Sequence, residues 1–200
     1  MKDNAVTPEV IVGMKIDEKD KVIISLLAEN PYMSQDEIAK EIRLSQPSVA
    51  VRIKKLRKGG GLATQTGINP QKLGLYLAKV DISSNNTSLI LNMFKNCPYF
   101  ANGFTVSGKY NLCLLFMSEN IATLEAIVNG HIRTHESTMD VDFNIVINSE
   151  KDFIVPVVLN SEHREKPPCG MMTHCLDCQS FKDKKCMGCP ATGEYQGWFY

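Results

Sequence analysis

The 200 residues contain 22 basic and 22 acidic side chains, so the formal net charge at pH 7 is zero. A chain without excess charge lacks the global signature of a polyanion-binding protein, and any contact with nucleic acid must depend on local charge. No apolar run reaches the length of a membrane span, and the first twenty residues are too charged for a signal peptide. We therefore expect a cytoplasmic protein with no membrane partner.

The first 67 residues carry the pattern of an arm followed by three short helices. Residues 1–16 have no strong period and are predicted to form the arm. Apolar residues at helical spacing behind Asp17, a good N-cap, predict a helix that runs to Asn30. Ser34 stands three residues before Glu37, which is the capping-box pattern and predicts the start of a second helix.

A third helix is predicted after Ser45, with Pro47 in its first turn and three glycines at 59–61 ending it. It carries five cations and no acid between Arg52 and Lys58. Three short helices, the last two joined by a short turn, make a helix-turn-helix. Residues 17–67 are therefore predicted to be a DNA-binding domain of the winged helix-turn-helix kind, with double-stranded DNA as the partner.

The candidate DNA-binding residues fall into three groups. Ser45, Gln46, Ser48 and Val51 begin the third helix, where side chains reach base edges. Lys54, Lys55 and Lys58 are expected to neutralise phosphates and set the salt dependence. Arg52 has two interpretations, a contact with DNA or an internal brace, because apolar residues flank it on the packed side.

Residues 68–160 change to alternating strands and helices. The predicted order is a strand at 75–82, a helix at 87–97 capped by Thr87, strands at 99–107 and 112–117, a helix at 121–132 and a strand at 141–147. This βαββαβ order is that of a ferredoxin-like sandwich in an α+β protein. Residues 153–159 are predicted to add an edge strand, because Pro156 suits a peripheral position.

Several strings resemble the Lrp/AsnC, or feast/famine, family of transcription regulators over roughly residues 17–150. Residues 44–56 read LSQPSVAVRIKKL, similar to that family's recognition helix, which typically reads L-S-x-x-x-V-x-x-R-I-x-x-L. Residues 62–74 resemble its linker into the sensing domain, and residues 108–111 resemble its turn between two strands. Two features depart from the family pattern: three successive glycines after the third helix, and Asn111 where an aspartate is common.

The resemblance implies a DNA-binding regulator, not an enzyme, that assembles with itself through the βαββαβ domain as a homodimer or a larger oligomer. It also implies a small-molecule effector, an amino acid in many members, bound near Gly108, Tyr110 and Asn111. An ordinary hairpin turn without a ligand is the alternative for those three residues.

Five of the seven cysteines lie in the last 32 residues, and residues 161–200 are predicted to form a metal knuckle. Two C-x2-C hooks, Cys175/Cys178 and Cys186/Cys189, are separated by seven residues and can supply four thiolates to Zn²⁺. A [4Fe–4S] cluster is the alternative cofactor, because Cys169 is a fifth thiol and Pro190 follows the last cysteine. The knuckle could be structural, contact a partner, or sense metal or redox state, and His174 is a substitute ligand.

Two other functions are consistent with parts of the sequence. Sirohaem-type tetrapyrrole decarboxylases share this architecture, and His131, Arg133 and His135 are the residues that such an enzyme would use here. His131 and His135 also have the spacing of a two-histidine metal pair, although surface histidines are the simpler interpretation. An adaptor whose tail recruits the transcription machinery is the third possibility.

Overall fold

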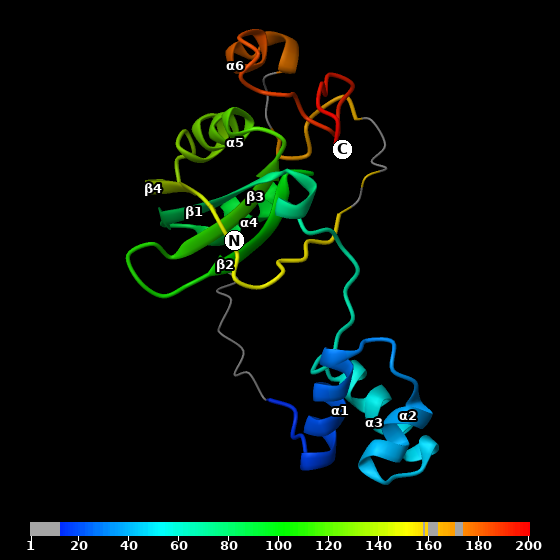
Figure 1. Ribbon diagram of the computed structural model, residues 1–200. Helices are drawn as coiled ribbons and strands as arrows, with labels where there is room; N and C mark the ends of the chain where they lie inside the picture. The colour runs from blue at the N-terminus through cyan, green and yellow to red at the C-terminus, as the bar shows by residue number, and fades with distance from the viewer. Residues whose placement is uncertain (1–12, 158, 160–163, 171–173) are drawn as a thin grey trace. The chain divides into compact units, whose positions relative to one another are not determined.

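The structure is a computed structural model that describes residues 13–157, 159, 164–170 and 174–200 (Figure 1). The chain divides into two compact units, Met1–Gln65 and Thr66–Tyr200. Residues 1–12 of the predicted N-terminal arm lie outside the described residues.

The first unit consists of three helices, α1 (Glu18–Glu29), α2 (Gln35–Ile42) and α3 (Gln46–Lys58). Both predicted N-caps are confirmed: the side chains of Asp17 and Ser34 accept from the third backbone N–H of α1 and α2. Each belongs to a capping box, which the sequence had predicted for Ser34 alone. Each helix contributes its apolar stripe to one core, whose buried members are Ile23, Leu27, Ile38, Ala39, Ile42, Val49, Ile53 and Leu56.

The turn between α2 and α3 is short because Arg43 adopts a left-handed conformation, with φ of 54°. Ser45 is the N-cap residue of α3, as predicted, and α3 ends at the first glycine of the Gly59–Gly61 run. In the described residues 59–67, which follow α3, no strand forms. The helix-turn-helix in this unit is therefore built by the three helices alone.

The second unit contains the predicted βαββαβ sandwich. Its elements are β1 (Tyr76–Ser84), α4 (Thr87–Phe94), β2 (Phe100–Thr105), β3 (Leu112–Ser118), α5 (Ile121–Ile127) with a π-helical continuation η2 (Val128–Ile132), and β4 (Thr138–Ile145). The strands form one antiparallel sheet in the order β2-β3-β1-β4. A short 3₁₀ helix, η1 (Gln71–Leu73), leads into β1.

Alternation along the strands separates the two faces of this sheet. Ala78, Val80 and Ile82 of β1 are fully buried, and they pack in one core with α4, α5 and η2. The opposite face is apolar at one end, where Leu77 and Met117 are covered by residues 153–157 and Phe199. Farther along, this face carries polar side chains such as Lys79 and Asp81.

Several predicted boundaries were wrong. The strand predicted at 99–107 is β2 (Phe100–Thr105), and the strand predicted at 141–147 is β4 (Thr138–Ile145). Helix α4 is capped by Asn86 rather than Thr87, because the Asn86 carboxamide accepts from the Leu89 N–H, and the helix ends at Phe94 rather than Cys97. The predicted edge strand at 153–159 is only an isolated bridge between Ile68 and Val155 in its described part. Pro156 has no N–H to extend the ladder, and the segment instead packs Phe153 and Val155 against the sheet.

The C-terminal tail, described over residues 164–170 and 174–200, packs on the sandwich. Its regular elements in those ranges are a 3₁₀ turn η3 (Cys175–Asp177) and a helix α6 (Gln179–Lys182). Tyr200 contacts the sandwich core, and its hydroxyl donates to the Met117 carbonyl at 3.1 Å. Across the residues with a described position, no helix is long and apolar enough to cross a bilayer.

Candidate functional site

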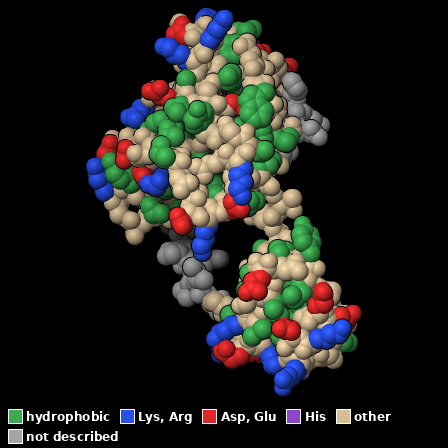
Figure 2. Space-filling view, in the orientation of Figure 1, with side chains coloured by type: hydrophobic (Ala, Val, Ile, Leu, Met, Phe, Trp, Pro, Cys, Tyr) green, Lys and Arg blue, Asp and Glu red, His purple; other side chains and the backbone are tan. Residues whose placement is uncertain are grey.

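Helix α3 presents a polar, basic face opposite its buried stripe. Its predicted base-reading residues Gln46, Ser48 and Val51 are exposed, and Val51 keeps 67% of its surface although it is apolar. The predicted phosphate-binding residues on the same helix, Lys54, Lys55 and Lys58, are also exposed. Figure 2 shows Lys and Arg side chains at the surface of this helical unit, with acidic side chains among them.

Local hydrogen bonds orient the first turn of α3. The hydroxyls of Ser45 and Ser48 lie 2.8 Å apart, and the Gln46 Nε2 donates to the Gln35 Oε1 at 2.8 Å. Because Gln35 begins α2, this bond links the two helices of the motif. The ends of Gln46 and Ser48 are thus held at the exposed start of α3, where a helix-turn-helix contacts base edges.

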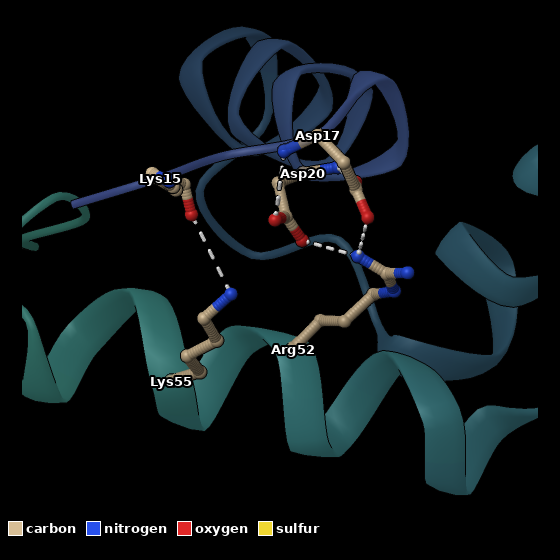
Figure 3. A network of polar contacts seen from close by, with 5 residues as sticks. All are labelled: Lys15, Asp17, Asp20, Arg52 and Lys55. Carbon is tan, nitrogen blue, oxygen red and sulfur yellow. Dashed lines mark hydrogen bonds and ion pairs between the residues drawn. The ribbon is translucent and has the colours of Figure 1, made fainter.

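Arg52 is engaged inside the unit, which favours the brace over the DNA contact. Its Nη1 lies 2.7 Å from the Asp17 Oδ2 and 2.6 Å from the Asp20 Oδ1, so one guanidinium ties α3 to the start of α1 (Figure 3). Asp20 is 1% exposed. A buried carboxylate needs a counter-charge, and Arg52 supplies it.

Electrostatics agree with this bracing role. The backbone N–H of Asp20 and the Arg52 guanidinium hold the pKa of Asp17 below its usual value, and the two aspartates raise the pKa of Arg52. Lys55 is turned toward the same region, with its ammonium 3.5 Å from the Lys15 carbonyl oxygen (Figure 3). Among the described residues, the side chains of Lys54 and Lys58 have no hydrogen-bond or ion-pair partner.

The predicted effector residues form a tightly bonded hairpin turn between β2 and β3. The Asn111 carboxamide accepts from the Ser84 N–H at 2.9 Å and donates to the Ser84 carbonyl at 2.7 Å. The Tyr110 hydroxyl donates to Asp140, whose pKa is lowered mainly by Lys109. Gly108 has φ of 124°, a conformation that favours glycine. In this structure, Asn111 therefore joins the turn to the end of β1.

A thiol-lined cavity of about 110 Å³ lies between the tail and the sandwich. All five predicted metal-binding cysteines line it, and a sixth comes from the sandwich; the six are Cys97, Cys169, Cys175, Cys178, Cys186 and Cys189. The rest of the wall is largely apolar and includes Phe94, Ile127 and Phe181. Cys97 was missed by sequence analysis, since a single cysteine in an apolar stretch carries no ligand pattern.

The second C-x2-C hook is fixed to the sandwich at two points. The Tyr99 hydroxyl donates to the Gly188 carbonyl at 2.6 Å, and the Met187 N–H donates to the Thr123 hydroxyl at 3.0 Å. Gly188 has φ of 80°, and a Cβ there would lie 2.6 Å from the Glu194 carbonyl oxygen. Only glycine fits this position, so the Cys186–Cys189 hook requires glycine at position 188.

Burial is the main influence on the pKa of three thiols in the tail. It raises the pKa of Cys175 and Cys186, and it raises the pKa of Cys189 to about 12, with the neighbouring thiols adding to the effect. Over the described part of the chain, no three ligand side chains already stand at the spacing of a metal cage. The thiols line one cavity without forming a preformed metal cage among the described residues.

The histidines are distributed among other roles. The His131 Nδ1 lies 3.1 Å from the Ile127 carbonyl, and burial lowers the pKa of this ring, which also lines the cavity. The His135 Nδ1 accepts from the Ser137 N–H. His174 caps η3 and pairs with Glu194 at 3.2 Å, so both of its ring nitrogens are engaged. His131 and His135 have separate partners and are both half-buried, so they are not the surface histidines that the sequence predicted.

Comparisons with known proteins match this geometry. The family described as winged helix-turn-helix DNA-binding matches residues 16–60. The transcriptional regulator AzlB of Bacillus subtilis is 25% identical, with 73% of this chain and 98% of the relative covered.

Two solved structures have the same fold. The structure of E. coli AsnC matches with a TM-score of 0.60 at 19% identity and covers 71% of this chain and 99% of its own. The transcriptional regulator NMB0573 of Neisseria meningitidis, in complex with L-Met, matches with a TM-score of 0.59 at 18% identity, over 73% and 98% of the two chains.

The matched motif, the order of the elements and these relatives are those of a transcriptional regulator of the Lrp/AsnC type, with a DNA-binding helix-turn-helix. AzlB and NMB0573, to which the chain is similar, are both named as transcriptional regulators.

Proposed function

We propose that this chain binds specific sites on duplex DNA through α3 and thereby regulates transcription. The observation that carries the proposal is the exposed face of α3, where Gln46, Ser48 and Val51 adjoin Lys54 and Lys55. A glutamine amide suits adenine, a hydroxyl suits several bases, and an apolar side chain suits the methyl group of thymine. The lysines add attraction to phosphates that is independent of sequence.

The regulator acts as a homodimer or a larger oligomer held by the sandwich. One helix-turn-helix buries little surface on DNA, and twofold assembly places two copies of α3 on two half-sites. The sheet face opposite the helices supports this proposal. One row of residues crosses its four strands, and it consists of Phe104, Cys113, Asp81 and Asp142. The Phe104 side chain in this row is 46% exposed. That row is a surface on which a second copy can pack.

A small-molecule effector is the second part of the proposal. The similar regulator NMB0573 was solved with L-Met, which supports an amino acid as the class of ligand. The turn at Gly108, Tyr110 and Asn111 is the candidate region by resemblance. Since Asn111 is already bonded to Ser84, binding there would use Tyr110 and the backbone of the turn.

The tail is proposed to bind a metal through Cys175, Cys178, Cys186 and Cys189. Their positions around one cavity support this assignment, and Zn²⁺ is the expected ion for a closed four-thiolate site. A [4Fe–4S] cluster is the alternative, for which Cys169 offers an additional thiol on the same wall.

DNA binding is tested by comparing two double variants of the full chain. Lys54→Ala/Lys55→Ala should weaken binding to every sequence and reduce the slope of log affinity against log salt by about two, because each lysine that meets a phosphate contributes about one. Lys95→Ala/Lys182→Ala removes the same charge from exposed positions of the second unit and should bind as the wild type does. Gln46→Ala should instead relax sequence preference.

Unchanged affinity and salt slope in the Lys54→Ala/Lys55→Ala variant would contradict the assignment of α3. Equal losses in both double variants would attribute binding to total charge rather than to this helix.

A further inference from the structure

The sandwich contributes its own thiol to the cavity of the tail. Cys97 lies in the loop between α4 and β2, more than 70 residues before the first cysteine of the tail. Its backbone is held on both sides, because the Cys97 N–H donates to the Phe94 carbonyl at 2.8 Å and the Phe100 N–H donates to the Cys97 carbonyl at 3.0 Å. The position of this thiol is therefore set by the sandwich and not by the tail.

A short bonded path joins Cys97 to the second hook. Tyr99 follows Cys97 by two residues, Gly188 precedes Cys189 by one, and the Tyr99 hydroxyl bonds to the Gly188 carbonyl at 2.6 Å. Cys169 and Cys189 of the tail line the same cavity as Cys97. Cys97 thus lies beside the tail thiols, in reach of the same central space.

We propose that Cys97 is a ligand of the tail's metal centre, which therefore spans the tail and the sandwich and takes a thiophilic metal, either Zn²⁺ or the iron of a [4Fe–4S] cluster. This inference rests on the proposed metal-binding function of the tail. Six thiols line this cavity, whereas a single zinc ion uses four ligands. The extra thiols allow either an iron–sulfur cluster or a zinc ion bound by four of the six.

The location of the centre couples metal content to the sensing domain. Ile127 at the end of α5, and Gly130 and His131 of the π-helical segment η2, line the same cavity. π-helical turns are rare and often mark functional sites. A metal bound by Cys97 and by the second C-x2-C hook would connect the α4–β2 loop to the tail beside α5.

The test uses the full chain purified without oxygen, with zinc, iron and acid-labile sulfide measured per chain. Cys97→Ala is compared with Cys113→Ala, a matched control, because Cys113 is the other cysteine of the sandwich and does not line the cavity. Cys178→Ser reports on the tail ligands. We expect Cys97→Ala to lose metal to a chelator at least tenfold faster than wild type, and Cys113→Ala to match wild type.

Circular dichroism separates loss of a ligand from loss of the fold. Cys97→Ala and Cys97→Ser are both measured, and the inference requires that a variant with wild-type secondary structure still loses metal. Zinc near one per chain identifies a zinc centre, while iron and sulfide near four per chain identify a cluster; either supports the inference if Cys97→Ala weakens retention.

Two failures are distinguishable. Metal that is bound by wild type, lost in Cys178→Ser and retained normally in Cys97→Ala would overturn the role of Cys97 alone. Wild-type protein that binds no added zinc and no reconstituted cluster would overturn the metal proposal for the tail as well, without affecting the assignment of α3.

Discussion

Among the cations of α3, Arg52 differs from its neighbours in what it contacts. Lys54 and Lys58 extend from the exposed face, whereas the Arg52 guanidinium is paired with Asp17 and Asp20 (Figure 3). A sequence shows only that five cations lie on one helix. Which of them are available to a phosphate depends on the acids that the first helix places opposite them.

Replacing Arg52 by methionine should therefore destabilise the helical unit rather than weaken DNA contacts directly. The substitution leaves the buried Asp20 carboxylate without its cation, and a buried charge without a partner is destabilising. Urea unfolding followed by circular dichroism at 222 nm should show a lower midpoint for Arg52→Met than for the wild type. Arg57→Met, at an exposed position of the same helix, is the control and should change stability little.

Asp17 should make the stability of this unit depend on acid pH. Its pKa in the folded chain is below the ordinary value of 3.8, so the stabilisation is present above pH 3.8 and is lost as the pH falls through the folded pKa. Unfolding free energies at pH 5 and pH 3 measure the effect. Asp17→Asn keeps the capping oxygen and removes the titrating group, so it should show a smaller difference between the two pH values.

At the scale of elements, the sequence predicted the regular parts and missed the junctions. The N-cap at Asp17 and the capping box at Ser34 are local patterns, and both are confirmed because their donors lie within three residues. The β-strand at 153–159 was wrong, because strand formation depends on a partner strand that the local sequence cannot reveal. Cys97 was overlooked for the same reason: only the folded loop brings it to the tail.

The hook at Cys186–Cys189 should be sensitive to its glycine. Gly188→Ala introduces a Cβ into the space occupied by the Glu194 carbonyl and forces an alanine to positive φ. Gly170→Ala is a matched control, since Gly170 has a similar φ of 76° but nothing within 4 Å of the added Cβ. Limited proteolysis should cut the tail of Gly188→Ala faster than that of Gly170→Ala. Equal rates would mean that close packing at Gly188 does not matter.

For the whole molecule, the sequence predicted the order of three segments but not their grouping. The helix-turn-helix, the sandwich and the cysteine-rich tail were recognisable from periodicity and spacing. The tail nevertheless packs with the sandwich in one compact unit, through Tyr99, Glu119 and Tyr200 among others. The tail shows little apolar periodicity of its own, and its aromatic residues give no indication of the surface that receives them.

Self-association should depend on the outer face of the sheet. Phe104→Asp places a charge in the exposed row that runs across the four strands, and it should weaken the oligomer by about tenfold or more, because burial of an aromatic side chain contributes about 1.5–3 kcal/mol. Light scattering of the full chain over a concentration series measures this. Leu176→Asp, at an exposed position of the tail, should leave the oligomer unchanged. A wild-type monomer at micromolar concentration would refute the assembly itself.

The uneven placement of charge has a practical consequence for handling the protein. At pH 7 the formal charges cancel, so an ordinary cation exchanger has no net attraction for the chain. A column of sulfated polysaccharide presents closely spaced anions, much as DNA does, and responds to the local lysines of α3 instead. We expect retention on such a column at neutral pH, and earlier elution of the Lys54→Ala/Lys55→Ala protein in the same salt gradient.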